Sequence, residues 1–188
     1  MKHLDLYGLA SGVEGGTSIL EALSESSIER LTHISLGLNE EWFTDDCNGQ
    51  LLADFIGRQQ CLRTLRLRRN EFSSEASDEI LHHLVESPAL QTIQDVNLFY
   101  SANFDSDVSV QALATLLANA PALKVINIGH QQGTRKVNVE VKYATAVDEE
   151  SGIEATEGTV TITDRADEST ICVVPTNKRS NQEVKIKQ

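Results

Sequence analysis

One short apolar pattern recurs along this chain at nearly constant spacing. Four segments share the form apolar-x-x-apolar-x-apolar, and they end at Leu36, Leu67, Leu98 and Ile128. A partial fifth copy ends at Leu6, so successive copies lie 30, 31, 31 and 30 residues apart. Repeated units of this kind stack on their neighbours, because no single unit buries its apolar face alone. The spacing therefore predicts an array of stacked structural units.

Each unit combines a short strand with a helix. In the copy that begins at Leu62, apolar residues take strand spacing up to Leu67 and helical spacing from Ile80 onward. Serines before the helical stripe can cap a helix, and Pro88 after it ends the helix. The other copies follow the same order. The sequence thus predicts about four and a half strand–helix units over residues 1–135.

Two units show local irregularities. The first helix is predicted to begin near residues 16–18, after a glycine-rich turn, because Ser18 and Glu21 have the spacing of a capping box. In the third full copy, the strand is predicted over residues 93–98 after a lengthened loop. The alternative register would bury the Asp95 carboxylate in the core, which is costly.

The pattern changes after the last copy. Val137, Val139 and Val141 alternate with polar residues, as in a strand. Up to three further strands are indicated, around residues 160–162, 171–174 and 184–186. The sequence predicts that residues 136–188 form an acidic, β-rich C-terminal cap or appendage. The alternative is a partly ordered tail.

The repeat pattern resembles that of the leucine-rich repeat family, in particular its ribonuclease-inhibitor-like class. A polar residue lies three positions after each strand motif, and these residues are Asn39, Asn70, Ser101 and Gln131. In the family this position is usually Asn or Cys, which satisfies backbone groups where the chain leaves the strand. The resemblance implies an α/β solenoid with a concave parallel sheet and convex helices. Serine and glutamine depart from the family pattern, so the later turns are expected to be less regular.

The resemblance also implies which side chains project from the concave face. Strand side chains alternate, so residues beside the last two apolar positions of each motif point away from the helices. The candidate partner-binding residues from this set are Tyr7, His33, Ser35, Arg66, Arg68, Asp95, Asn97, Phe99 and Asn127. Tyrosine and arginine are enriched at binding hot spots. Arg66 and Arg68 either dock an acidic partner or pair with acids on flanking strands or loops.

Charge and composition narrow the function classes. With 16 Lys and Arg against 28 Asp and Glu, the net charge is −12, which argues against a nucleic-acid binder. No apolar run is long enough to span a bilayer or resembles a signal peptide. Three cysteines without CxxC spacing favour free thiols in a reducing compartment. We therefore expect a cytoplasmic, intracellular protein without membrane insertion.

No group of residues in the sequence predicts catalysis, a metal or a cofactor. The segment Gly12–Ser18 lacks the lysine of a phosphate loop. The histidines at 82–83 lie one helical turn from acids at 78–79, but two ligands do not define a metal site. His33 near Ser35 lacks a third, orienting group. We expect neither an enzyme nor a bound cofactor.

The expected function is a scaffold for protein–protein interaction that binds a partner through the concave face. The alternative is a regulator, inhibitor-like or GTPase-activator-like, of a partner enzyme or small GTPase, because the resemblance extends to such scaffolds. The first strand, at Leu4 and Leu6, is expected to be an uncapped edge. Self-association through that edge is a second expected interaction.

Overall fold

The core of the molecule is a parallel sheet with helices on one face. The computed structural model describes residues 2–44, 46–147, 154–166, 168, 170–176 and 185–188. Within these ranges, six strands pair in the order β1-β2-β3-β4-β5-β9. They are β1 (His3–Asp5), β2 (His33–Ser35), β3 (Thr64–Arg66), β4 (Asp95–Asn97), β5 (Val125–Asn127) and β9 (Lys185–Lys187). This arrangement confirms a mixed α/β fold.

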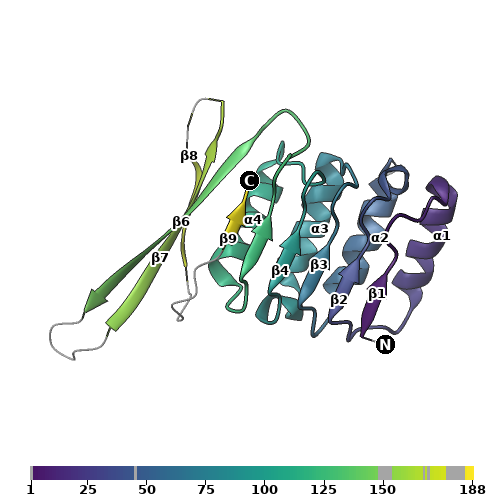
Figure 1. Cartoon of the computed structure of the whole chain (residues 1–188), viewed down its shortest axis with the longest axis horizontal. Helices are drawn as coiled ribbons and strands as arrows, with labels where there is room; N and C mark the ends of the chain where they lie inside the picture. The colour runs from purple at the N-terminus through teal and green to yellow at the C-terminus, as the bar shows by residue number, and fades with distance from the viewer. Residues whose placement is uncertain (1, 45, 148–153, 167, 169, 177–184) are drawn as a thin grey trace.

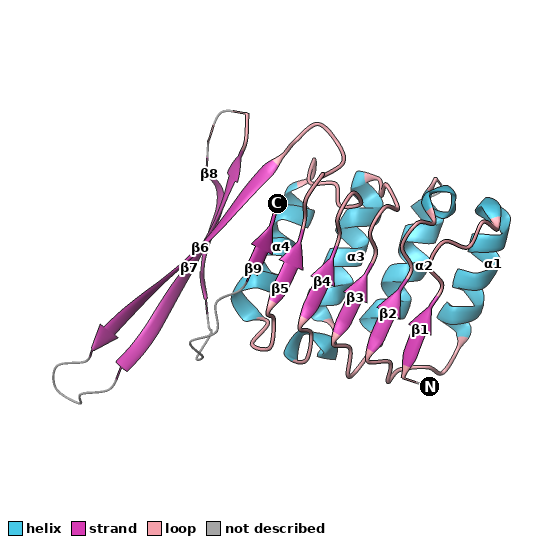
Figure 2. Cartoon of the chain, in the orientation of Figure 1, coloured by secondary structure: helices cyan, strands magenta, loops and turns pink. Residues whose placement is uncertain are grey.

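Four helices alternate with the first five strands along the described chain. They are α1 (Gly12–Glu25), α2 (Asp46–Gly57), α3 (Ser74–Glu86) and α4 (Asp107–Asn119). Two short 3-10 helices, η1 (Glu40–Phe43) and η2 (Pro88–Gln91), lie in the connections. The helices stand side by side behind the sheet (Figures 1 and 2). The opposite face, called the open face below, carries no helix in these views.

The repeated motif sets the register of the sheet. The central residue of each strand pairs with the central residue of the next, and these residues are Leu4, Ile34, Leu65, Val96, Ile126 and Ile186. The first five are buried among the side chains of the helices. Because strand side chains alternate, the residues on either side of each central position project from the open face. Strand β1 pairs only with β2 among the described strands, as expected for an edge.

A ladder of buried polar side chains secures the chain where it leaves the strands. The Asn70 Nδ2 group donates to the carbonyl oxygens of Leu36 (3.0 Å) and Leu67 (2.9 Å). The Asn70 Oδ1 atom accepts from the backbone N–H of Asn39 (3.0 Å). Asn39 repeats this pattern one unit earlier in the chain. Ser101 continues it, because its hydroxyl donates to the Leu67 carbonyl and accepts from the Asn70 N–H.

The ladder changes at its last member. The Gln131 side chain donates to the Val137 carbonyl (2.8 Å) and accepts from the Val137 N–H (2.7 Å). The serine in the third copy keeps the two bonds to the preceding unit. Its own backbone N–H donates to the Leu98 carbonyl (3.0 Å), whereas the Asn39 and Asn70 N–H groups donate to the next ladder side chain, so this turn is less regular, as expected. The glutamine in the fourth copy instead connects the repeats to β6.

A left-handed residue follows every strand motif at the same position. The residues are Gly8, Leu38, Arg69, Tyr100 and His130, with φ angles of 67°, 59°, 58°, 59° and 52°. Only the first is glycine, the residue that adopts this conformation without steric cost. The others hold a conformation that costs roughly 1–2 kcal/mol for an L-residue. Their repetition shows that the turn before the ladder residue imposes the backbone conformation.

Helix α1 begins earlier than the sequence predicts. It starts at Gly12, so the capping box predicted at Ser18 and Glu21 lies inside the helix and does not cap it. Gly16, one of the glycines predicted to form a turn, lies inside this helix and packs against the Trp42 ring. A Cβ atom on Gly16 would lie within 2.4 Å of the Trp42 ring, which leaves no room for a larger residue.

The third copy has the predicted lengthening. Helix α3 ends before Pro88, η2 follows, and β4 begins at Asp95. The Asp95 side chain is 37% exposed, so it projects from the open face and not into the core. The desolvation argument for this register is confirmed.

The C-terminal segment forms a second, antiparallel sheet. Strands β6 (Val137–Val147), β7 (Glu154–Asp164) and β8 (Thr170–Thr176) pair in that order. This sheet packs against α4, and Val137, Val139, Val160 and Ile162 are buried there. The predicted strands in this region are confirmed, except that Val184 lies outside the described residues. Strand β9, which the sequence pattern groups with the appendage, returns to the main sheet beside β5 (Figure 1).

The Asp105 carboxylate joins the last repeat to the second sheet. It accepts hydrogen bonds from the backbone N–H of Arg135 (2.6 Å) and from the N–H and hydroxyl of Thr134 (2.8 and 3.0 Å). Desolvation raises the pKa of this carboxyl, but these hydrogen bonds outweigh it. The pKa of Asp105 therefore lies below its usual value.

The junction at Asp105 is expected to weaken in acid. A carboxyl whose pKa is lower in the folded state stabilises the fold above its unfolded pKa, near 3.8, and loses this contribution as pH falls through the folded value. We expect Asp105→Asn to be less stable than the native chain at pH 6, with the gap narrowing below about pH 4. Urea denaturation of both chains across this pH range measures the difference in their free energies of unfolding. A gap independent of pH would contradict the assignment.

Candidate functional site

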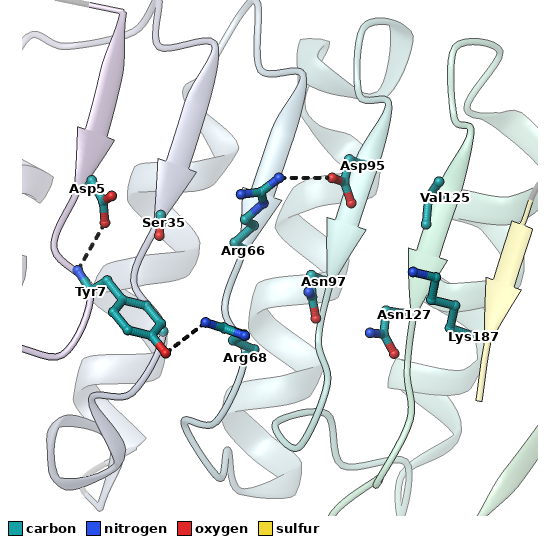
Figure 3. Close-up of a pocket in the computed structure, with 11 residues that line it drawn as sticks. Asp5, Tyr7, Ser35, Arg66, Arg68, Asp95, Asn97, Val125, Asn127 and Lys187 are labelled. Atoms are coloured by element: carbon teal, nitrogen blue, oxygen red, sulfur yellow. Dashed lines mark hydrogen bonds and ion pairs between the residues drawn. The ribbon is translucent and has the colours of Figure 1, made fainter.

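The open face of the sheet carries a groove of about 550 Å³ (Figure 3). Seven of the nine predicted partner-binding residues line it, and they are Tyr7, Ser35, Arg66, Arg68, Asp95, Asn97 and Asn127. The alternation of the strands explains this placement, because all seven neighbour a buried or partly buried apolar residue of the repeat motif. The structure thus brings most of the predicted set into one groove.

His33 and Phe99 do not line this groove. The His33 ring packs on the His3 ring, with 4.1 Å between centroids, towards the start of the strands. The Phe99 ring makes an edge contact with His130, with 5.0 Å between centroids, beyond the strand ends. Both side chains border the open face, but their neighbours are other aromatic rings.

One arginine of the groove has a carboxylate partner on the next strand. The Arg66 Nη2 atom lies 3.5 Å from the Asp95 Oδ2 atom, and the side chains are 56% and 37% exposed. An ion pair this exposed contributes at most about 1 kcal/mol to stability. Arg66 therefore remains available to a stronger anionic ligand.

The second arginine contacts a tyrosine instead of an acid. The Arg68 guanidinium donates to the Tyr7 hydroxyl (2.8 Å) and lies 4.9 Å from the centre of the Tyr7 ring. The two side chains meet across Gly37 of the intervening segment, as Figure 3 shows for Tyr7 and Arg68. A Cβ atom on Gly37 would lie 3.0 Å from Arg68 Cγ and 3.1 Å from Tyr7 Cδ2. Arg68 keeps its positive charge uncompensated by any described carboxylate.

Two asparagines of the groove have a fixed amide orientation. The Asn97 Oδ1 atom accepts from the Phe99 N–H (3.1 Å), and the Asn127 Oδ1 atom accepts from the Gly129 N–H (3.2 Å). Because the carbonyl oxygens bond to the backbone, the NH₂ groups remain as donors. Neither NH₂ group donates to another residue in the described part of the chain.

Four further residues line the groove, and they are Asp5, Gly37, Val125 and Lys187. The first three belong to the same repeat positions as the predicted set. Lys187 escaped prediction because it comes from β9, far from the repeats in sequence. A strand around residues 184–186 was predicted, but it was grouped with the C-terminal appendage, whereas β9 pairs in parallel with β5 of the main sheet.

The pKa of the His33 imidazole lies below its usual value. Desolvation is the main cause that lowers its pKa, and the nearby His3 and two arginines, Arg63 and Arg66, lower it further. The Thr32 hydroxyl donates to the Lys2 carbonyl oxygen (3.0 Å). His33 Nδ1 lies 2.9 Å from Thr32 Oγ1, so with the hydroxyl proton directed at Lys2 the tautomer that carries Nδ1–H donates to Oγ1. This pair does not activate the hydroxyl as a nucleophile.

The histidines of α3 lie beside acids of the helical layer. His83 lies 3.8 Å from Glu79, as its spacing predicted, and 3.5 Å from Asp54 of α2. His82 lies 3.3 Å from Glu86. Within the described ranges, no group of three or more His, Cys, Asp or Glu residues is arranged to hold a metal ion. None of the described helices has both the length and the apolar character needed to cross a bilayer.

Comparison with known proteins does not assign the chain to a family. No protein-family model matches the chain, and no curated protein matches it. The repeat pattern, the parallel sheet and the chemistry of the groove therefore carry the functional argument.

Proposed function

We propose that this chain is a leucine-rich-repeat interaction module that binds an acidic segment of a partner protein on its open face. The observation that carries the proposal is the charge of the groove. Arg66, Arg68 and Lys187 line it together, against Asp5 and Asp95, in a chain whose net charge is −12. A groove with more cations than carboxylates attracts an acidic segment, while the acidic remainder of the protein repels acidic surfaces that approach elsewhere.

The repeat geometry supports the leucine-rich-repeat part of the proposal. The strands recur every 30 or 31 residues, pair in parallel and keep their helices on one side. Buried Asn39 and Asn70 hold the turns through the same bonds in successive units. Such stacks present a broad sheet surface for binding other macromolecules.

The groove favours a peptide over a nucleic acid. Nucleic-acid affinity rests on many phosphate contacts to a basic surface. Here two carboxylates lie within the groove itself, and the protein as a whole is strongly acidic. Donors spaced among a few charges instead suit the carboxylates and carbonyls of a polypeptide.

The test is a charge reversal in the groove. The double variant Arg66→Glu/Arg68→Glu is expected to weaken partner binding by about tenfold, or about 1.4 kcal/mol. Captures from the native source with the native chain and the variant are compared by mass spectrometry. The matched control is Arg30→Glu/Arg63→Glu, which makes the same charge change at exposed positions outside the groove. Equal recovery of the same proteins by all three chains would contradict the proposal.

A further inference from the structure

The groove contains a straight row of hydrogen-bond donors that crosses four strands. The sheet register places Arg66, Asn97, Asn127 and Lys187 opposite one another on β3, β4, β5 and β9. All four line the groove, and Figure 3 shows them side by side. The register continues through Ser35 to Asp5 on β1. The Asp5 carboxylate repels an acidic ligand, so it confines such a ligand to the part of the row from β3 to β9.

Every member of this row presents donors. Arg66 and Lys187 carry only N–H groups. The Asn97 and Asn127 carbonyl oxygens bond to the backbone N–H groups of Phe99 and Gly129, which leaves their NH₂ groups for a ligand. The row therefore selects a ligand that carries acceptors along its length, with a negative charge at each end.

The two cations differ in how they are held. Arg66 forms an ion pair with Asp95 at 3.5 Å. Because both side chains are exposed, a ligand carboxylate can bind Arg66 beside Asp95 or in its place. Lys187 forms no ion pair with any described residue, and it is exposed. Both ends of the row can thus receive a carboxylate.

The distance between the cations sets the spacing of the ligand. Arg66 and Lys187 are three strand steps apart, which is roughly 14 Å because neighbouring strands lie about 4.8 Å apart. In an extended peptide, residues i and i+4 point to the same side and lie about 13 Å apart. Residues i and i+2 are only about 7 Å apart, and residue i+3 points to the opposite side.

We infer that the groove recognises an extended acidic segment that crosses β3 to β9 with two carboxylates four residues apart, one on Arg66 and one on Lys187. The inference rests on the proposed function and adds the sequence spacing of its ligand. The Asn97 and Asn127 amides donate to the acceptors between the two carboxylates. The ligand lies across the strands, so its own backbone does not extend the sheet.

Three synthetic peptides test the spacing. Each has nine residues of glycine and serine with two glutamates, placed at i and i+2, i and i+3, or i and i+4. Glycine and serine keep the peptides from forming helices, which would bring i and i+4 together. Fluorescence polarisation at low salt is expected to show about tenfold tighter binding of the i and i+4 peptide. Equal binding of the three peptides would overturn the spacing.

Variants of the two cations give the second arm of the test. Lys187→Gln and Arg66→Gln are each expected to lower the affinity for the i and i+4 peptide to that for the i and i+3 peptide. Lys185→Gln is the matched control, because Lys185 is an exposed lysine on the same strand that does not line the groove. A preference that survives Lys187→Gln would overturn the assignment of that cation.

The outcomes separate the spacing from the proposed function. If all three peptides bind the native chain equally and Arg66→Glu/Arg68→Glu abolishes binding, the acidic-ligand function stands and the spacing fails. If none of the peptides binds, the spacing also fails, and the partner capture described above decides the function independently.

Discussion

Replacing Asn70 with alanine is expected to lower the free energy of unfolding by about 3 kcal/mol. Asn70 is fully buried, and its side chain satisfies the Leu36 and Leu67 carbonyls and the Asn39 N–H. Alanine leaves three buried backbone groups without these partners, and each orphaned group costs roughly 1–3 kcal/mol before local relaxation. For a chain of this length the thermal midpoint should fall by roughly 6–12 °C.

The matched control for this prediction is Asn97→Ala. Asn97 is partly exposed, and among the described residues its side chain bonds only to the Phe99 N–H, so loss of the amide should cost about 0.5 kcal/mol. Urea denaturation of both variants and the native chain measures the difference. Losses of similar size at the two asparagines would show that the ladder contributes little beyond an ordinary exposed hydrogen bond.

The repeat in the sequence was enough to predict most of the sheet. The motif spacing located the first five strands and the insertion before β4, because burial of apolar residues fixes strand register. The same alternation placed seven of the nine candidate residues around one groove. The ladder position at Asn39 and Asn70 was predicted from the resemblance to leucine-rich repeats, which implies that the polar residue three positions after each motif satisfies backbone groups at the turn.

Other features depend on contacts that the sequence does not record. Gly16 lies within helix α1 and serves close packing instead of a turn, because the Trp42 ring occupies the space where a side chain would lie. The left-handed turns at Leu38 and Arg69 carry no glycine, so the usual marker for this backbone conformation is missing. Lys187 entered the groove through a long-range pairing of β9 with β5.

The sequence and the structure predict opposite effects of Gly49→Ala on the free energy of unfolding. A glycine inside a helix is normally less stable than alanine by about 1 kcal/mol, so the sequence alone predicts stabilisation. Gly49 is buried in α2, where an added Cβ would lie 2.6 Å from the Ala76 Cβ and 2.9 Å from the Ala76 Cα of α3. These atoms cannot rotate away, so the two helices must separate. We expect a net loss of about 2 kcal/mol, measured by urea denaturation.

The contact itself can be isolated with a matched control and a double variant. At Gly57, the last residue of α2, an added Cβ would meet the His83 Cβ at an ordinary 3.5 Å. Gly57→Ala should therefore leave stability unchanged or raise it by about 0.5 kcal/mol. Ala76→Gly in the Gly49→Ala chain removes the 2.6 Å contact between the two Cβ atoms but leaves the 2.9 Å contact with the Cα of residue 76. It should therefore recover part of the loss, although Ala76→Gly alone destabilises α3. Additive losses in the double variant would mean that α2 and α3 do not meet at this pair.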